Sequence, residues 1–71
     1  MTDSKALRDW IYKSGLKLKA IAAEIGITPY SLQKKIDNES EFKASEIAVF
    51  VNVFRMTPRD RDAIFFALNV E

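Results

Sequence analysis

The 71-residue sequence contains no cysteine and no histidine. Without cysteine the chain forms neither a disulfide nor a thiolate metal site, and its composition fits a reducing compartment. Histidine is the commonest metal ligand and the usual general base near neutral pH, so its absence disfavours most hydrolytic and metal-assisted chemistry. We therefore expect a protein that is not an enzyme and that uses neither a metal nor a cofactor.

Glycine and proline are also scarce, with two of each, whereas 48% of the residues are hydrophobic. This balance favours a compact helical fold, and the length corresponds to one domain over residues 1–71. No apolar run approaches the roughly 18 residues that a membrane span needs, and the N-terminal segment lacks the pattern of a signal peptide. We expect a cytoplasmic protein with no membrane partner and no small-molecule ligand.

Charge is distributed unevenly along the chain, although the net charge is only +1. Residues 5–35 carry seven basic and two acidic side chains, a net charge of +5, whereas residues 36–71 carry four basic and seven acidic ones, a net charge of −3. Such asymmetry is typical of a protein whose N-terminal half meets a polyanion. Uneven charge is also common in small proteins, so this pattern alone does not decide the function.

Apolar residues recur with a helical period along most of the chain, which predicts an all-α bundle of five short helices. Threonine followed by proline, at Thr28 and Thr57, is typical of a helix start, because threonine caps the helix and proline suits its first position. Gly26 is expected to end the second helix, and Asn38 is expected to follow the third in the left-handed conformation. The predicted helices are 4–14, capped by Ser4 or Thr2, then 18–25, 29–36, 44–54 and a last one that begins at Pro58.

The helix predicted over 44–54 is apolar on nearly every side, so it is either central in the bundle or shared with a partner chain. Its composition also suits a buried strand, but the helical spacing of its apolar residues favours a helix. Trp10 and Phe42 are interpreted as core contacts. In the last helix, the residues expected to face the core are Ile64, Phe65 and Leu68. Phe66 and Val70 either complete the core or form a dimer seam, whose expected members are Val49, Val53, Phe66 and Val70.

Residues 18–36, LKAIAAEIGITPYSLQKKI, join two of the predicted helices through a tight turn. With Ala22 followed four residues later by Gly26, this stretch resembles the helix-turn-helix of lambda-repressor-like domains, the Xre type of phage Cro and repressor proteins. The resemblance extends over nearly the whole chain. It implies that Ala22 is small because the next helix crosses close over it, and that Gly26 sets the steep angle that seats this helix in a major groove.

The resemblance also implies which side chains contact DNA. Gln33 suits the N6 and N7 atoms of adenine, Lys34 suits N7 and O6 of guanine, and Tyr30 suits a thymine methyl, a base edge or a phosphate. Each lysine has the alternative of being a solvated surface charge, and Thr28 is chiefly a helix cap. The residues expected to contact phosphate are Lys17, Lys19, Thr28, Lys35, Asn38 and Lys43.

The sequence departs from the family pattern at three places. Leu18 stands where a polar phosphate contact is common, and Pro29 stands where a base-contacting side chain is common. The usual asparagine-glycine after the recognition helix is here Asn38-Glu39, with further acidic residues beside it. Acidic side chains close to phosphates lower affinity, so we expect specific binding to depend on a dimer.

Two functions are consistent with these patterns. The first is a sequence-specific DNA-binding transcription regulator, a phage or prophage repressor or Cro-like protein that binds a pseudo-palindromic operator as a homodimer. The alternative is a protein-interaction module of the same fold that acts through its apolar C-terminal helices.

Overall fold

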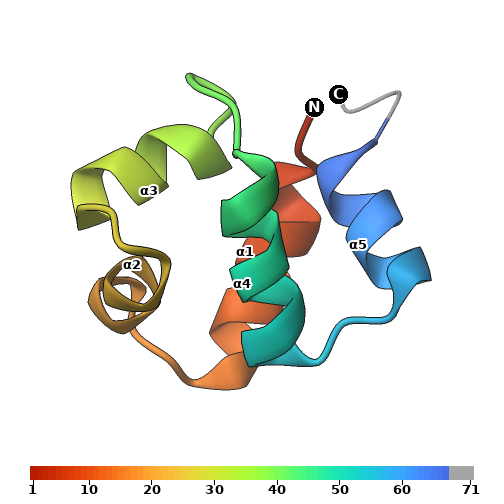
Figure 1. The fold of residues 1–71 in the computed structure, drawn as a ribbon, viewed down its shortest axis with the longest axis horizontal. Coiled ribbons are helices and arrows are strands. Elements are labelled where there is room, and N and C mark those ends of the chain that lie inside the picture. Colours follow the sequence, from red (N-terminus) through yellow and green to blue (C-terminus); the bar gives the residue numbers. More distant parts are fainter. Residues whose placement is uncertain (68–71) are drawn as a thin grey trace.

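The computed structural model describes residues 1–67, and this part of the chain contains helices and no strand, which confirms the predicted all-α bundle. Leu68 and Val70, for which the sequence predicts a core and a seam position, lie outside the described residues. Figure 1 shows α1 and α4 crossing at the centre, with α2 and α3 on one side and α5 on the other. The helices are α1 (Ser4–Ser14), α2 (Leu18–Ile25), α3 (Pro29–Ile36), α4 (Ala44–Phe54) and α5 (Pro58–Phe65). None of them is long and apolar enough to cross a bilayer.

Two helices begin as the sequence predicts. The Thr28 hydroxyl accepts the Ser31 N–H at 3.0 Å, and the Thr57 hydroxyl accepts the Asp60 N–H at 3.1 Å. Each cap satisfies an N–H that has no partner within the helix, and a proline follows each cap at the first helical turn. These contacts fix where α3 and α5 start.

α1 begins at Ser4 as the sequence predicts, but its cap differs from the prediction. The cap is Asp3, whose carboxylate accepts the Ala6 N–H at 3.1 Å, and it is neither Ser4 nor Thr2. Thr2 is buried, and Ser4 is the first helical residue. Aspartate is as good a cap as serine, so local preference alone does not choose among these neighbouring residues.

The core is built around Phe50 of α4. The ring centroids of Phe42, Phe54 and Phe65 each lie 5.5 Å from that of Phe50, a distance typical of aromatic pairs. Trp10 stacks on Phe54 with centroids 6.2 Å apart, as expected for a core contact. The buried hydrophobic residues are Leu7, Ile11, Ile21, Ala22, Leu32, Ile36, Ile47, Phe50, Met56, Ile64 and Phe65.

The turn between α2 and α3 is closed by its backbone. Gly26 has a φ of 88°, and the N–H groups of Gly26 and Ile27 donate to the Ala22 carbonyl at 2.9 and 3.0 Å. A Cβ at Gly26 would meet no atom within 4 Å, so glycine is needed there for the backbone angle alone. Ala22 is completely buried, and α2 packs against α3.

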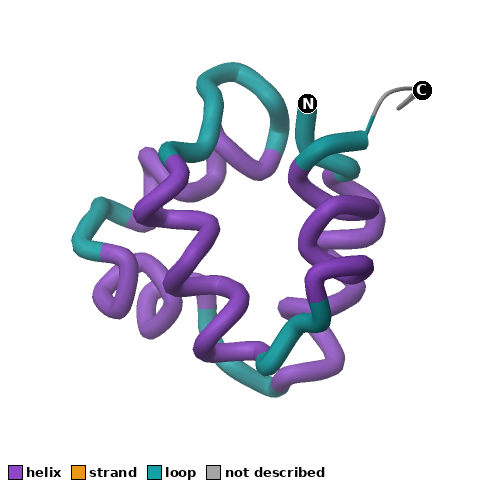
Figure 2. The backbone as a smooth tube through the Cα atoms, turned by 45° about the vertical axis from the view of Figure 1, so that its right-hand side comes forward, coloured by secondary structure: helices purple, strands orange, loops and turns teal. Residues whose placement is uncertain are grey.

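The connection between α3 and α4 lies beside the N-terminal residues, as the tube in Figure 2 shows. Phe42, in this connection, packs on the core as predicted. Met56, in the connection between α4 and α5, is also buried although no helical period marks it. Core contacts from both loops therefore close the bundle around α4.

We predict that Phe50→Ala lowers the free energy of unfolding by about 3–5 kcal/mol, because it removes the ring on which three others pack. Urea unfolding followed by circular dichroism measures the loss. Asn52→Ala, at an exposed position of the same helix, is the control and should change the value by less than about 0.5 kcal/mol. Equal small losses for both variants would contradict the central place of Phe50.

Candidate nucleic-acid interface

The outward surface of α3 carries four polar or aromatic side chains at positions i, i+3, i+4 and i+7, here called the α3 face: Tyr30, Gln33, Lys34 and Asp37. This spacing places them along one side of the helix and its C-terminal cap. The opposite side is buried and consists of Leu32, Lys35 and Ile36. The helix thus separates a core side from a solvent side.

The predicted base-contacting residues form two side-chain pairs with their neighbours on the α3 face. The Lys34 ammonium lies 5.5 Å from the centroid of the Tyr30 ring, which is 74% exposed at the residue level. The Gln33 amide donates from Nε2 to Oδ2 of Asp37 at 3.3 Å. Tyr30, Gln33 and Lys34 therefore lie together on one surface, as the sequence predicts.

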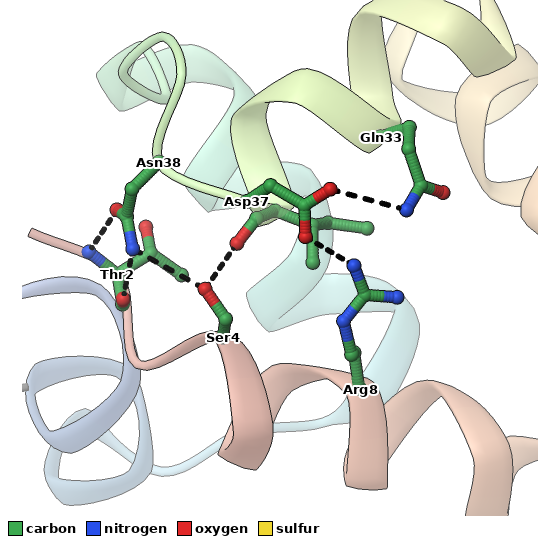
Figure 3. Close-up of polar contacts among 7 residues, drawn as sticks. Thr2, Ser4, Arg8, Gln33, Asp37 and Asn38 are labelled. Atoms are coloured by element: carbon green, nitrogen blue, oxygen red, sulfur yellow. Dashed lines mark hydrogen bonds and ion pairs between the residues drawn. The ribbon is translucent and has the colours of Figure 1, made fainter. Parts of the chain in front are cut away.

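Asp37 also forms an ion pair with Arg8 of α1. Figure 3 shows the Arg8 guanidinium directed at Oδ1 of Asp37, while Oδ2 faces Gln33. Arg8 and Asp37 are 29 residues apart in the sequence. One carboxylate thus joins α1 to the C-terminal end of α3 and to a predicted base-contacting side chain.

Three of the predicted phosphate-contacting lysines are exposed at the starts of helices. Lys17 and Lys19 lie at the head of α2, and Lys43 immediately precedes α4. Within residues 1–67 none of the three forms an ion pair. Lys17 also provides no side-chain cap, so the first N–H groups of α2 are left to solvent or to an anion.

The predicted phosphate contact of Lys35 is corrected by the structure. Lys35 is 8% exposed, and its Nζ lies 2.6 Å from both carboxylate oxygens of Glu46 in α4. Oε1 of Glu46 also accepts the Lys43 N–H at 2.7 Å. The ammonium of Lys35 is therefore held inside the protein, where it joins α3 to the first turn of α4.

Asn38 likewise has an internal role, which corrects its predicted phosphate contact. It has the expected left-handed backbone, with a φ of 62°. Its Nδ2 donates to the Thr2 carbonyl at 2.8 Å and to the Ser4 hydroxyl at 3.2 Å, and its Oδ1 accepts the Thr2 N–H at 2.9 Å. Ser4 in turn donates to the Ile36 carbonyl (Figure 3). The Asn38 amide therefore fastens the N-terminus to the end of α3.

The Thr28 hydroxyl caps α3 and is also able to donate a hydrogen bond. Its hydroxyl oxygen accepts the Ser31 N–H as a helix cap, and its side chain is exposed at the start of α3. A hydroxyl that accepts one hydrogen bond can still donate its own proton. Its position is compatible with both roles that the sequence predicts, a cap and a phosphate contact.

The predicted seam residues lie on two flanks of α4. Val53 lines a surface hollow with Trp10 and Leu16, whereas Phe66 lines a different hollow between α4 and α5. Val51 belongs to the second hollow, and residues two apart in a helix point to nearly opposite sides. This α4–α5 hollow, of 440 Å³, is lined by Ala44, Ile47, Ala48, Val51, Arg61 and Phe66. Val49 and Val53 therefore do not form one continuous surface with Phe66.

Sequence reasoning missed three residues of this region. Glu46 carried a usable signal, because an acidic residue in the first turn of a helix often accepts a backbone N–H there. Arg8 and Asp37 carried none, since their distance along the chain gives no indication that they meet. The structure therefore adds one buried charge, Glu46, and an exposed ion pair between Arg8 and Asp37 to the predicted site.

The pKa of Glu46 follows from two opposing effects. Burial by itself raises this pKa, but hydrogen bonds from the Lys35 ammonium and the Lys43 N–H, with both positive charges, outweigh burial. The net result is a pKa below the ordinary value of 4.5. Glu46 is therefore ionised at neutral pH and forms a true ion pair.

No protein-family model, curated protein or solved structure matches this chain. Among residues 1–67, no three acidic side chains are grouped so that they could hold a metal ion. The function is therefore inferred from the chemistry of the α3 face and the lysines beside it.

We predict that Lys35→Met lowers the free energy of unfolding at pH 7 by about 3–5 kcal/mol, because the Glu46 carboxylate stays buried without its partner. Lys35→Met combined with Glu46→Gln should cost much less, since glutamine keeps an acceptor for the Lys43 N–H and no charge remains. Chemical unfolding of the two variants gives the comparison.

The same pair makes stability depend on pH. Because the folded-state pKa of Glu46 is lowered, its contribution to stability is complete above the ordinary value of 4.5 and is lost as the pH falls through the folded-state pKa. The double variant, Lys35→Met with Glu46→Gln, should lack this part of the loss of stability in acid. Identical acid profiles for wild type and double variant would show that the pair does not contribute.

Proposed function

We propose that this protein is a sequence-specific DNA-binding transcription regulator, in which α2 and α3 act as a helix-turn-helix and α3 enters the major groove. The observation that carries the proposal is the α3 face, where Tyr30, Gln33 and Lys34 project together from one side of a helix. A major groove, about 12 Å wide, admits a single α-helix. The resemblance of residues 18–36 to lambda-repressor-like domains supports the same function.

Each side chain on this surface has chemistry suited to a base edge. A glutamine amide pairs with N6 and N7 of adenine, and a lysine ammonium donates to N7 and O6 of guanine. Lys34 is already directed across the Tyr30 ring, so the two side chains meet the groove as one unit. Tyr30 is then placed to contact a thymine methyl or a backbone phosphate.

Phosphate contacts on both sides of α3 would hold it in register. Lys17 and Lys19 lie with free helical N–H groups at the head of α2, and Lys43 lies after the α3–α4 connection. Lys35 and Arg8 would contribute less to phosphate binding than their charge implies, because each is paired with a carboxylate. We therefore propose a modest affinity for one domain, most of it dependent on salt.

A modest affinity favours binding as a homodimer. Two domains on a pseudo-palindromic operator would place their recognition helices in half-sites about 34–36 Å apart. The α4–α5 hollow, with Phe66 55% exposed at its edge, is the apolar surface that we propose for the dimer contact. Bound at a promoter in the cytoplasm, as the resemblance to phage repressors suggests, such a dimer would repress by excluding polymerase.

The same hollow supports the alternative function, a protein-interaction module that does not bind DNA. Exposed apolar surface between two helices is typical of a site for another protein. Sedimentation distinguishes the two functions: a monomer that ignores duplex DNA favours the module. A dimer that binds DNA favours the regulator.

We predict that selection from a random pool of duplexes yields a two-fold-related site that this protein binds. Lys34→Ala should lose about 1–3 kcal/mol at one base pair, whereas Lys19→Ala should weaken all duplexes alike and flatten the salt dependence. Fluorescence titrations at two salt concentrations measure both effects. Failure of the wild type to bind random duplex at low salt would exclude the proposal.

A further inference from the structure

We propose that Asp37 is a positioning residue for base recognition: held by Arg8 of α1, it fixes the Gln33 amide in one orientation on the α3 face. This inference rests on the proposed DNA-binding function. It concerns how one base-contacting side chain is oriented before DNA arrives.

The orientation follows from hydrogen-bond chemistry. An ionised carboxylate only accepts, so the end of the Gln33 amide that faces Asp37 has to be the Nε2 group, which lies 3.3 Å from Oδ2. Nε2 carries two protons, and only one of them is used. The second proton and the free Oε1 are the donor and the acceptor that adenine N7 and N6 require.

Asp37 is itself held on three sides. Its Oδ1 is occupied by the Arg8 guanidinium, its Oδ2 accepts from Gln33, and its backbone N–H donates to the Gln33 carbonyl at 3.0 Å. The two carboxylate oxygens thus have different partners, as Figure 3 shows. A carboxylate that also accepts from the guanidinium of another helix limits the orientations of the Gln33 amide that it holds.

Asp37 would have two opposite effects on DNA binding. Ordering the Gln33 side chain in advance spares part of the entropy lost on binding, which corresponds to about two- to tenfold in affinity for the correct base pair. Its negative charge beside the groove lowers affinity for every duplex. Asp37 would therefore lower the affinity for every duplex and raise the selectivity at one base pair.

Asp37→Ala separates these effects. The base pair that Gln33 contacts is first found as the position where Gln33→Ala loses discrimination. Dissociation constants are then measured at one salt concentration for the selected duplex, for the same duplex with that base pair exchanged, and for random duplex. We expect Asp37→Ala to bind random duplex more tightly, and to discriminate about two- to tenfold less at the Gln33 position.

Three controls isolate the role. Glu39→Gln removes an exposed negative charge two residues away, so it should tighten binding to all duplexes and leave discrimination unchanged. In the Gln33→Ala background, Asp37→Ala should cause no further loss of discrimination. Arg8→Ala should reduce discrimination at the same base pair, whereas Lys5→Ala, exposed one turn earlier in α1, should not.

The outcomes are distinct. If Asp37→Ala tightens binding to all duplexes with unchanged discrimination, Asp37 is only a repulsive charge and the inference is wrong, while DNA binding stands. If the wild type binds no duplex, the proposed function fails and the inference with it. If Asp37→Ala does not fold, Arg8→Ala provides the test. If Arg8→Ala discriminates at the Gln33 position as well as wild type does, the inference that Arg8 and Asp37 position Gln33 is wrong.

Discussion

The contact between Lys35 and Glu46 determines which side of α3 faces the core and which side faces solvent. It joins the buried side of α3 to the first turn of α4, with the ammonium 2.6 Å from both carboxylate oxygens. Taking both charges out of water is costly, so such a pair adds little net stability over an apolar pair, but breaking it leaves a buried charge. The arrangement in which these two groups meet is therefore strongly favoured over a rotated or shifted α3.

This constraint separates the chemistry of α3 into two sides. The core side is closed by apolar residues and one ion pair, and the solvent side is left with the α3 face. At its C-terminal end the helix is tied to α1 and the N-terminus by Asp37 and Asn38. In the proposed function, a helix held at its side and at its end would enter a DNA groove with little reorganisation, which would favour selectivity over raw affinity.

Helix positions were predictable because their signals are local. The threonine-proline starts and the helical spacing of apolar residues predicted the bounds of α2, α3 and α4 and the start of α5 closely, whereas α5 ends at Phe65, before Phe66, which the sequence places in that helix. Gly26 ends α2, and Asn38 adopts the predicted left-handed backbone. The ion pair of Lys35 was harder to predict than the side of α3 on which it lies. A helical rotation of about 100° per residue places Lys35 on the core side with Leu32 and Ile36, and directs the adjacent Lys34 to solvent. A buried lysine needs a partner, and the sequence does not indicate that this partner is Glu46 of α4.

The most direct test of the account is a titration of ¹⁵N-labelled protein with duplex DNA at low salt, followed by NMR. We predict that the largest shifts occur at Tyr30, Gln33 and Lys34, with smaller ones at the head of α2. The buried Lys35 side chain should keep its resonance. Unchanged resonances on the α3 face at saturating duplex would contradict the central claim that this surface binds DNA.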